Sequence, residues 1–288
     1  MILLHMVIIL CCSDTVRAVW QNRGLTGTMS YFTFASQGNA TAWGTDGYNY
    51  SRMCSMFCAN SNGVYGMNMG GYQSNYTDTS HPQILTQGFQ TQIVRWTMSD
   101  TNVRPAPFGD LASGNRFYQG GFNNATKSFV AGGYPSGGAA LNTIDVASFA
   151  TSGDATNFGN MTSSGSYCSG LGDKTTAVYS IGVRDTSDPL PRFNDDLDYI
   201  TMETAGNASS FGDIGVNKVY GTGACNNDTR GLFHGGFGGS TSNNAGGSGV
   251  YYNFIRYITI QTPGNAQTFG SLPVSGYSGT YERDATSG

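Results

Sequence analysis

The chain has 288 residues, of which 42 are Gly, about 15% and roughly twice the ordinary share. Charged residues make up only 11%, and Lys and Glu, the usual residues of exposed helix faces, occur three times and twice. This composition excludes a helix-rich fold, whereas 39% hydrophobic residues can bury a core. The net charge of −4 and the lack of a basic stripe indicate no nucleic-acid partner. We expect an all-β chain of short strands and tight turns.

The chain begins with an apolar run over residues 1–12. A run of this length is too short to span a bilayer, which needs about 20 residues. No Lys or Arg precedes it and no small-x-small cleavage site follows it, as a signal peptide would require. We interpret residues 2–10 as a buried strand, with a leader remnant as the alternative, and we predict no membrane span.

Five segments of the chain share a β-type run and an aromatic residue followed by Gly, and most carry a Gly-Asn-Ala or Gly-Asp-Ala turn in between. The turns lie at residues 38–40, 153–155, 206–208 and 264–266. The aromatic anchors are Trp43, Phe108, Phe158, Phe211 and Phe269. Because these anchors recur at fixed positions, we expect them to pack one repeat against the next.

Each repeat also holds two further strand candidates. A small-residue stretch follows the first four anchors, and then a hydrophobic strand, such as residues 128–133 and 231–236, that ends in Gly-Gly. Four strands in about 50 residues are typical of a β-propeller blade. The third repeat departs from this pattern, because Ser180-Ile181-Gly182 replaces Gly-Gly.

The hydrophobic strand ending in Gly-Gly resembles kelch-type repeats. Residues 198–201, 206–208, 211–213 and 229–236 resemble more closely the kelch-like repeats of tail-fibre and appendage proteins of marine phages and related viruses. The resemblance extends over nearly the whole chain. It implies a β-propeller, a virion or extracellular location, and other virion or appendage proteins as partners, with several copies in an assembly.

The two ends of the chain predict how the propeller closes. Residues 286–288 stop where other repeats enter their second strand. We therefore expect five blades of four antiparallel strands, closed by pairing of the N-terminal strands with the C-terminal strand, which leaves no open edge. A fragment of a longer array is the alternative. The expected single domain spans 1–288, with units 1–50, 51–111, 112–161, 162–214 and 215–272, and 273–288 completing the first blade.

No catalytic constellation stands out in the sequence. The six Cys match no zinc or redox spacing, and the three His lie in different repeats. The segment at residues 194–198, which holds three Asp, lacks the Gly and distal Glu of an EF loop, so we interpret it as a solvated loop. We predict no metal, no cofactor and no enzymatic activity. A carbohydrate-active propeller is the alternative, with Asp46, Asp110 and Asp213 as its candidate carboxylates.

The connections between the second and third strands differ most between repeats, and variable loops on a rigid scaffold are the usual place for recognition. We expect a non-enzymatic virion structural or appendage protein that recognises a host-surface glycan or a protein receptor through this face. A secreted carbohydrate-binding propeller remains an alternative, as does a eukaryotic coat or adhesion glycoprotein with glycans on its seven Asn-x-Ser/Thr sites. The candidate binding residues are Trp20, Tyr72, Tyr76, Tyr134, Arg184, Arg192, Phe193, Tyr251 and Tyr252.

Overall fold

The computed structural model describes residues 8–13, 17–22, 29–33, 39, 41–42, 58–73, 88–101, 105–184, 195–216, 219–239, 249–276 and 281–283. Within these ranges every regular element is a β-strand and no helix occurs. Accordingly, the described part of the chain offers no helix that is long and apolar enough to cross a membrane. The all-β fold expected from the composition is confirmed.

The strands form five main sheets, numbered here in chain order, in which neighbours along the chain pair antiparallel. Sheet 1 holds β1 (Ile8–Ser13), β2 (Arg17–Asn22), β3 (Met29–Thr33) and β4 (Thr41–Ala42). Sheet 2 holds β5 (Cys58–Ser61), β6 (Tyr65–Gln73), β7 (Gly88–Thr97) and β8 (Ala106–Asp110). Sheet 3 holds β9 (Gly120–Asn123), β10 (Lys127–Ala131), β11 (Thr143–Ser148) and β12 (Thr156–Asn160).

The last two main sheets continue the pattern. Sheet 4 holds β13 (Ser169–Gly172), β14 (Thr176–Ser180), β15 (Asp196–Thr201) and β16 (Ser209–Asp213). Sheet 5 holds β18 (Gly223–Asn226), β19 (Arg230–His234), β22 (Phe254–Thr259) and β23 (Gln267–Ser271), with β24 (Tyr281–Arg283) added beside β18. A small sheet of β17 (Val219–Tyr220), β20 (Phe237–Gly239) and β21 (Gly249–Tyr251) lies next to it.

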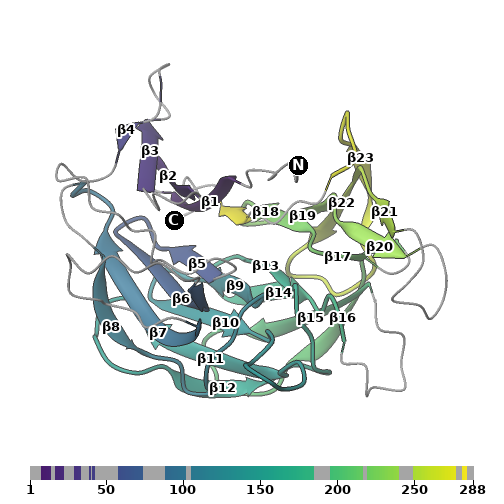
Figure 1. Cartoon of the computed structure of the whole chain (residues 1–288). Helices are drawn as coiled ribbons and strands as arrows, with labels where there is room; N and C mark the ends of the chain where they lie inside the picture. The colour runs from purple at the N-terminus through teal and green to yellow at the C-terminus, as the bar shows by residue number, and fades with distance from the viewer. Residues whose placement is uncertain are drawn as a thin grey trace.

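The sheets are arranged like the blades of a propeller. The first strand of each sheet lies beside the first strand of the next, from β1 through β5, β9 and β13 to β18. Figure 1 shows these strands near the middle of the molecule and the last strands, such as β8, β12 and β23, at its periphery. Small residues permit this crowding, because a Cβ on Gly170 would lie 2.7 Å from the carbonyl oxygen of Gly121 on the neighbouring first strand.

The hydrophobic core lies between adjacent sheets. Between sheets 3 and 4, the ring of Phe122 lies 5.4 Å from that of Phe129 and 5.2 Å from that of Tyr179, and all three side chains are fully buried. Comparable clusters fill the space between sheets 2 and 3 and between sheets 4 and 5. Sheets 2 to 5 are therefore stabilised mainly by packing against one another.

The repeated motif of the sequence forms a contact between neighbouring sheets, which we name the inter-sheet clasp. Each described anchor (Phe108, Phe158, Phe211 and Phe269) is the extra residue of a β-bulge in the outermost strand of its sheet. The turn at residues 153–155 of sheet 3 docks on the segment of sheet 2 that starts at Phe108. In the same way, the turn at 206–208 docks on the segment that starts at Phe158, and the turn at 264–266 on the segment that starts at Phe211.

The hydrogen bonds of the clasp repeat in all three places. The Ala of each turn donates its N–H to the carbonyl of the second residue after the anchor, at 2.8 Å every time. The side chain of Asp154, Asn207 or Asn265 accepts the N–H of that same residue at 3.0–3.1 Å. The residue directly after the anchor must be Gly, since a Cβ on Gly109 or Gly159 would overlap the carbonyl of the docked turn.

The expected pairing of the C-terminal strand with the N-terminal strands is not confirmed. Among the described residues, sheet 1 takes all four strands from residues 8–42, and β24 pairs in parallel with β18. The physical reason is that the N-terminal region supplies two strands, β1 and β2, where the apolar run at residues 2–10 predicted one. Sheet 1 therefore has four strands without a C-terminal one, and β24 lies between β18 and β1.

Candidate functional site

One end of the sheets collects the variable connections. Because the strands alternate in direction, each second strand ends, each third strand begins and each fourth strand ends at the same end. The connections from second to third strand, and from each sheet to the next, therefore emerge together. We call this end the loop face.

Nine aromatic side chains of the loop face form one continuous row, which we call the aromatic arc: Tyr72, Phe89, Phe117, Tyr118, Tyr134, Tyr167, Tyr220, Phe237 and Tyr251. Adjacent rings lie with their centroids 3.8–6.4 Å apart. All nine are half-buried or exposed, with Tyr134 at 39% and Tyr251 at 53% exposure. The arc therefore offers ring surface to solvent from sheet 2 to the small sheet.

Equivalent backbone positions generate much of the arc. Phe117 pairs with Tyr134 in an isolated bridge, and Tyr220 pairs with Phe237 in the small sheet. In sheet 4, the equivalent bridge joins Ser166 to Val183, which have no rings. The ring of Tyr167 bridges this gap, lying 3.8 Å from that of Tyr118 and 5.2 Å from that of Tyr220.

Tyr118 and Tyr167 have strained backbones. Their φ angles are 59° and 57°, in the left-handed region, and no other described residue except Gly has a positive φ. Each precedes the first strand of its sheet by two residues, and the equivalent residue in sheet 5 is Gly221, with φ 61°. A left-handed conformation costs a non-Gly residue about 1–2 kcal/mol. Strain of this kind clusters at functional sites, so the two Tyr side chains are candidates for a binding role.

The strained positions are linked by their backbones. The N–H of Tyr167 donates to the carbonyl of Tyr118 at 2.6 Å, and the N–H of Gly221 donates to the carbonyl of Tyr167 at 3.3 Å. The tyrosine rings stack with an interplanar angle of 19°. Their orientation is therefore fixed before any ligand arrives, which lowers the entropic cost of binding.

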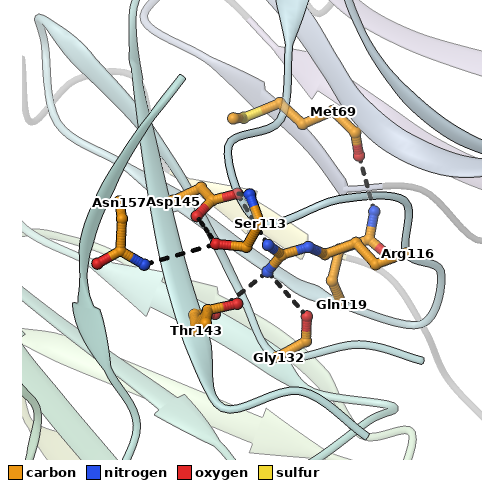
Figure 2. A network of polar contacts seen from close by, with 8 residues as sticks. All are labelled: Met69, Ser113, Arg116, Gln119, Gly132, Thr143, Asp145 and Asn157. Carbon is orange, nitrogen blue, oxygen red and sulfur yellow. Dashed lines mark hydrogen bonds and ion pairs between the residues drawn. The ribbon is translucent and has the colours of Figure 1, made fainter. Parts of the chain in front are cut away.

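A buried ion pair holds the loop that carries Phe117 and Tyr118. Arg116 and Asp145 are both fully buried, and a guanidinium nitrogen lies 2.8 Å from the carboxylate (Figure 2). Arg116 also donates to the carbonyls of Gly132 and Thr143 at 3.1 Å. Asp145 accepts the hydroxyl of Ser113 at 2.6 Å and its N–H at 2.9 Å. The loop is thus fixed to sheet 3 at two points.

The same loop is also bound to sheet 2. The side-chain amide of Gln119 donates to the carbonyl of Met69 at 2.7 Å (Figure 2), and the carbonyl of Arg116 accepts the N–H of Gly71 at 2.8 Å. The tyrosine between these attachments, Tyr118, is therefore held between two sheets.

Sheet 4 fixes its corresponding loop through Asp198, which occupies the position of Asp145 in sheet 3. The hydroxyl and N–H of Thr162 both donate to Asp198, at 2.8 Å. Burial raises the pKa of Asp198, and these hydrogen bonds oppose the rise. Arg184 donates to the hydroxyl of Ser163 at 3.0 Å and pairs with Asp196. Ligand binding by Arg184 stays a prediction, and the structure gives the residue an internal role instead: it is 7% exposed and its guanidinium binds these two groups.

The other candidate residues divide into four groups. Tyr72, Tyr134 and Tyr251 belong to the aromatic arc. Tyr252 is half-buried against Phe254, with a ring distance of 5.8 Å, and burial raises its pKa. Trp20 lies within β2 rather than in a connection. Tyr76, Arg192 and Phe193 lie outside the described residues.

Six members of the arc were missed by sequence reasoning. One signal was present: an aromatic residue stands just before the first strand of three consecutive sheets, at residues 117–118, 167 and 220. The missed residues are Phe89, Phe117, Tyr118, Tyr167, Tyr220 and Phe237.

Acidic groups gather on the loop face at the outer side of sheet 4. Asp195, Asp196 and Asp213 place one carboxylate oxygen each within 4.8 Å of one another, the spacing at which a cation could be shared. Burial, and then the charges of Asp213 and Asp196, raise the pKa of Asp195. Two of the candidate catalytic carboxylates, Asp110 and Asp213, lie on outermost strands of different sheets and do not converge; Asp46 lies outside the described residues.

Cys168 lies beneath the arc, directly after Tyr167. Burial raises the pKa of its thiol to about 12, and its Sγ donates to the carbonyl of Ile181 at 3.3 Å. The thiol is therefore protonated at neutral pH, which makes it a structural group rather than a nucleophile.

Comparisons with known proteins bear on the fold. No protein-family model matches the chain, and no curated protein matches it. Solved structures do match, and among 222 matching chains is the structure of YjhT, with a TM-score of 0.70 and 12% sequence identity. The match covers 96% of this chain and 88% of that one. At this identity the likeness shows the fold alone: an all-β chain whose four-stranded antiparallel sheets are arranged like a propeller.

Proposed function

We propose that the protein is a non-enzymatic recognition module that binds carbohydrate through the aromatic arc. The observation that carries this proposal is the pair of tyrosines, Tyr118 and Tyr167, placed at a backbone position where sheet 5 uses Gly. Backbone strain at both positions lowers stability, so the two stacked tyrosine rings are best explained by a function such as ligand binding. Loops fixed on a rigid scaffold are the usual place for such recognition.

The chemistry of the arc suits a sugar. The C–H faces of a sugar ring are apolar and pack on aromatic rings, whose faces carry partial negative charge. Six of the nine arc residues are Tyr, and each adds a hydroxyl that can exchange hydrogen bonds with sugar hydroxyls. The buried pair Arg116 and Asp145 beneath the arc is neutral overall, and Arg184 likewise pairs with Asp196. We therefore favour an uncharged oligosaccharide over an acidic or basic ligand.

We place this module in a virion appendage or another extracellular assembly. The resemblance of the repeats to those of phage fibre and appendage proteins supports this placement. Other virion or appendage proteins would be its partners, and a host-surface glycan or receptor its target. Several copies in an assembly would convert weak single contacts into tight attachment.

We also infer that the five main sheets are the blades of one closed propeller that forms a single domain. The succession of neighbouring first strands from β1 to β18 supports this inference, as does the position of β24 beside both β18 and β1. β24 would then complete the ring of central strands without belonging to the first blade.

A glycan array followed by calorimetry tests the function. We expect the purified protein to bind one or a few neutral oligosaccharides, and Tyr134→Ala and Tyr251→Ala to weaken binding. Tyr257→Ala is the matched control, because Tyr257 is a half-buried tyrosine of sheet 5 outside the arc. Binding to no glycan, or turnover of the bound glycan, would contradict the proposal.

A further inference from the structure

The inter-sheet clasp leaves one half unmatched at the outer edge of sheet 5. The anchors Phe108, Phe158 and Phe211 are covered by the next sheet's turn and are 3–8% exposed. Phe269 occupies the same bulged position in β23 but is 56% exposed. A Cβ on Gly270 would meet no atom within 4 Å, whereas a Cβ on the equivalent Gly212 would lie 2.5 Å from the docked turn. The edge thus has the shape of a clasp without its turn.

The complementary half lies at the other end of the chain. Residues 38–40 read Gly-Asn-Ala and come directly before β4, just as residues 153–155 come directly before β12. Asn39, the residue of this segment that the structure describes, is exposed. Asn39 corresponds to Asp154, Asn207 and Asn265, which accept a backbone N–H in the three formed clasps.

We infer that the edge of β23 is a docking site for the Gly-Asn-Ala turn at residues 38–40 of the same chain. In the docked state, the side chain of Asn39 accepts the N–H of Ser271, the residue equivalent to Asp110, Asn160 and Asp213. The turn covers Phe269 and passes over Gly270. A turn from the same chain is favoured over one from a second copy because β24 lies beside both β18 and β1, which brings sheets 5 and 1 together.

The substitution Gly270→Val tests the docking. Gly270 does not have a positive φ and has free space at its Cβ, so Val is tolerated if the edge is open. If the turn docks there, the side chain of Val overlaps it, as it would at Gly159 in a formed clasp. We expect Gly270→Val to lower the melting temperature and to accelerate proteolysis at least 10-fold, in the same direction as Gly159→Val. An unchanged melting temperature for Gly270→Val beside a lowered one for Gly159→Val would overturn the inference.

A double-mutant cycle with milder substitutions covers the case in which either Val variant fails to fold. Asn39→Ala and Phe269→Ala are each compared with the double variant by urea unfolding. A docked turn makes the two effects non-additive, and strict additivity would overturn the docking. Sedimentation velocity gives the source of the turn: a monomer is expected, and a dimer that Gly270→Val dissociates would overturn docking within one chain. Glycan binding plays no part in these readouts, so this inference and the proposed function stand or fall separately.

Discussion

Replacement of Asp145 by Asn probes how the arc is held in place. The carboxylate of Asp145 is fully buried, lies 2.8 Å from Arg116 and accepts two hydrogen bonds from Ser113. Asn keeps the shape but loses the charge, and its amide group places a donor where the carboxylate accepts. Removing one partner of a buried ion pair leaves an uncompensated charge and costs about 3–5 kcal/mol.

The chain provides a matched Asp→Asn control. Asp154 is exposed and makes its clasp bond with a side-chain oxygen, and the equivalent residues Asn207 and Asn265 show that Asn serves equally well there. We expect Asp154→Asn to change the free energy of unfolding by less than about 0.5 kcal/mol.

Urea unfolding followed by circular dichroism measures both variants. A loss of about 3–5 kcal/mol for Asp145→Asn corresponds to a fall of roughly 10 °C in the melting temperature of a domain of this size. Glycan affinity should fall as well, because the ion pair fixes the loop that carries Phe117 and Tyr118. If Asp145→Asn and Asp154→Asn differ by less than about 1 kcal/mol, the reasoning that the buried pair anchors this loop is refuted.

Two further predictions concern titratable groups. The pKa of Asp195 is raised in the folded chain, so the stability that its protonated form contributes is present below pH 3.8 and is lost as the pH rises through the folded pKa. Asp195→Asn should therefore be more stable than the parent at pH 7 and lose this advantage below pH 3.8. Urea unfolding at both pH values measures the two differences in stability. An equal difference at both pH values would contradict a raised pKa of Asp195. The pKa of Cys168 is raised to about 12, so iodoacetamide at pH 8 should leave it unmodified in the native protein and modify it in urea, by peptide mass spectrometry; rapid native modification would contradict its burial.

The repeat spacing predicted the all-β, propeller-like fold because the turns and the aromatic-Gly pairs impose local geometry. The strand over residues 17–22 was not anticipated, since only its three central residues are apolar and the longer apolar run before it dominates the pattern. The sequence around Arg184 predicts an exposed loop residue, because most of its neighbours are polar. Its partners Ser163 and Asp196 lie elsewhere in the chain, so its burial could not be predicted from these neighbours.

Three of the nine residues of the aromatic arc could be predicted from the sequence, and six could not. Tyr134 and Tyr251 stand in the connections between second and third strands, and Tyr72 lies at the end of β6 where such a connection begins. An exposed aromatic residue in a variable connection indicates binding. Tyr118 and Tyr167 give only the weaker signal of an aromatic residue before a first strand, and propensity argues against Tyr in a left-handed conformation. Their role emerges only when the backbone aligns them with Gly221.

The central claim is that Tyr118 and Tyr167 are strained in order to bind a ligand, and the double variant Tyr118→Gly/Tyr167→Gly tests it most directly. Gly relieves about 1–2 kcal/mol of strain at each position and costs about 0.5–1 kcal/mol in chain entropy, so stability should change little once the stacked rings are lost. The measurement is calorimetric titration of the neutral oligosaccharide selected on the array into both proteins. We expect an affinity at least 10-fold weaker for a folded variant, and an unchanged affinity would contradict a binding role for the two tyrosines.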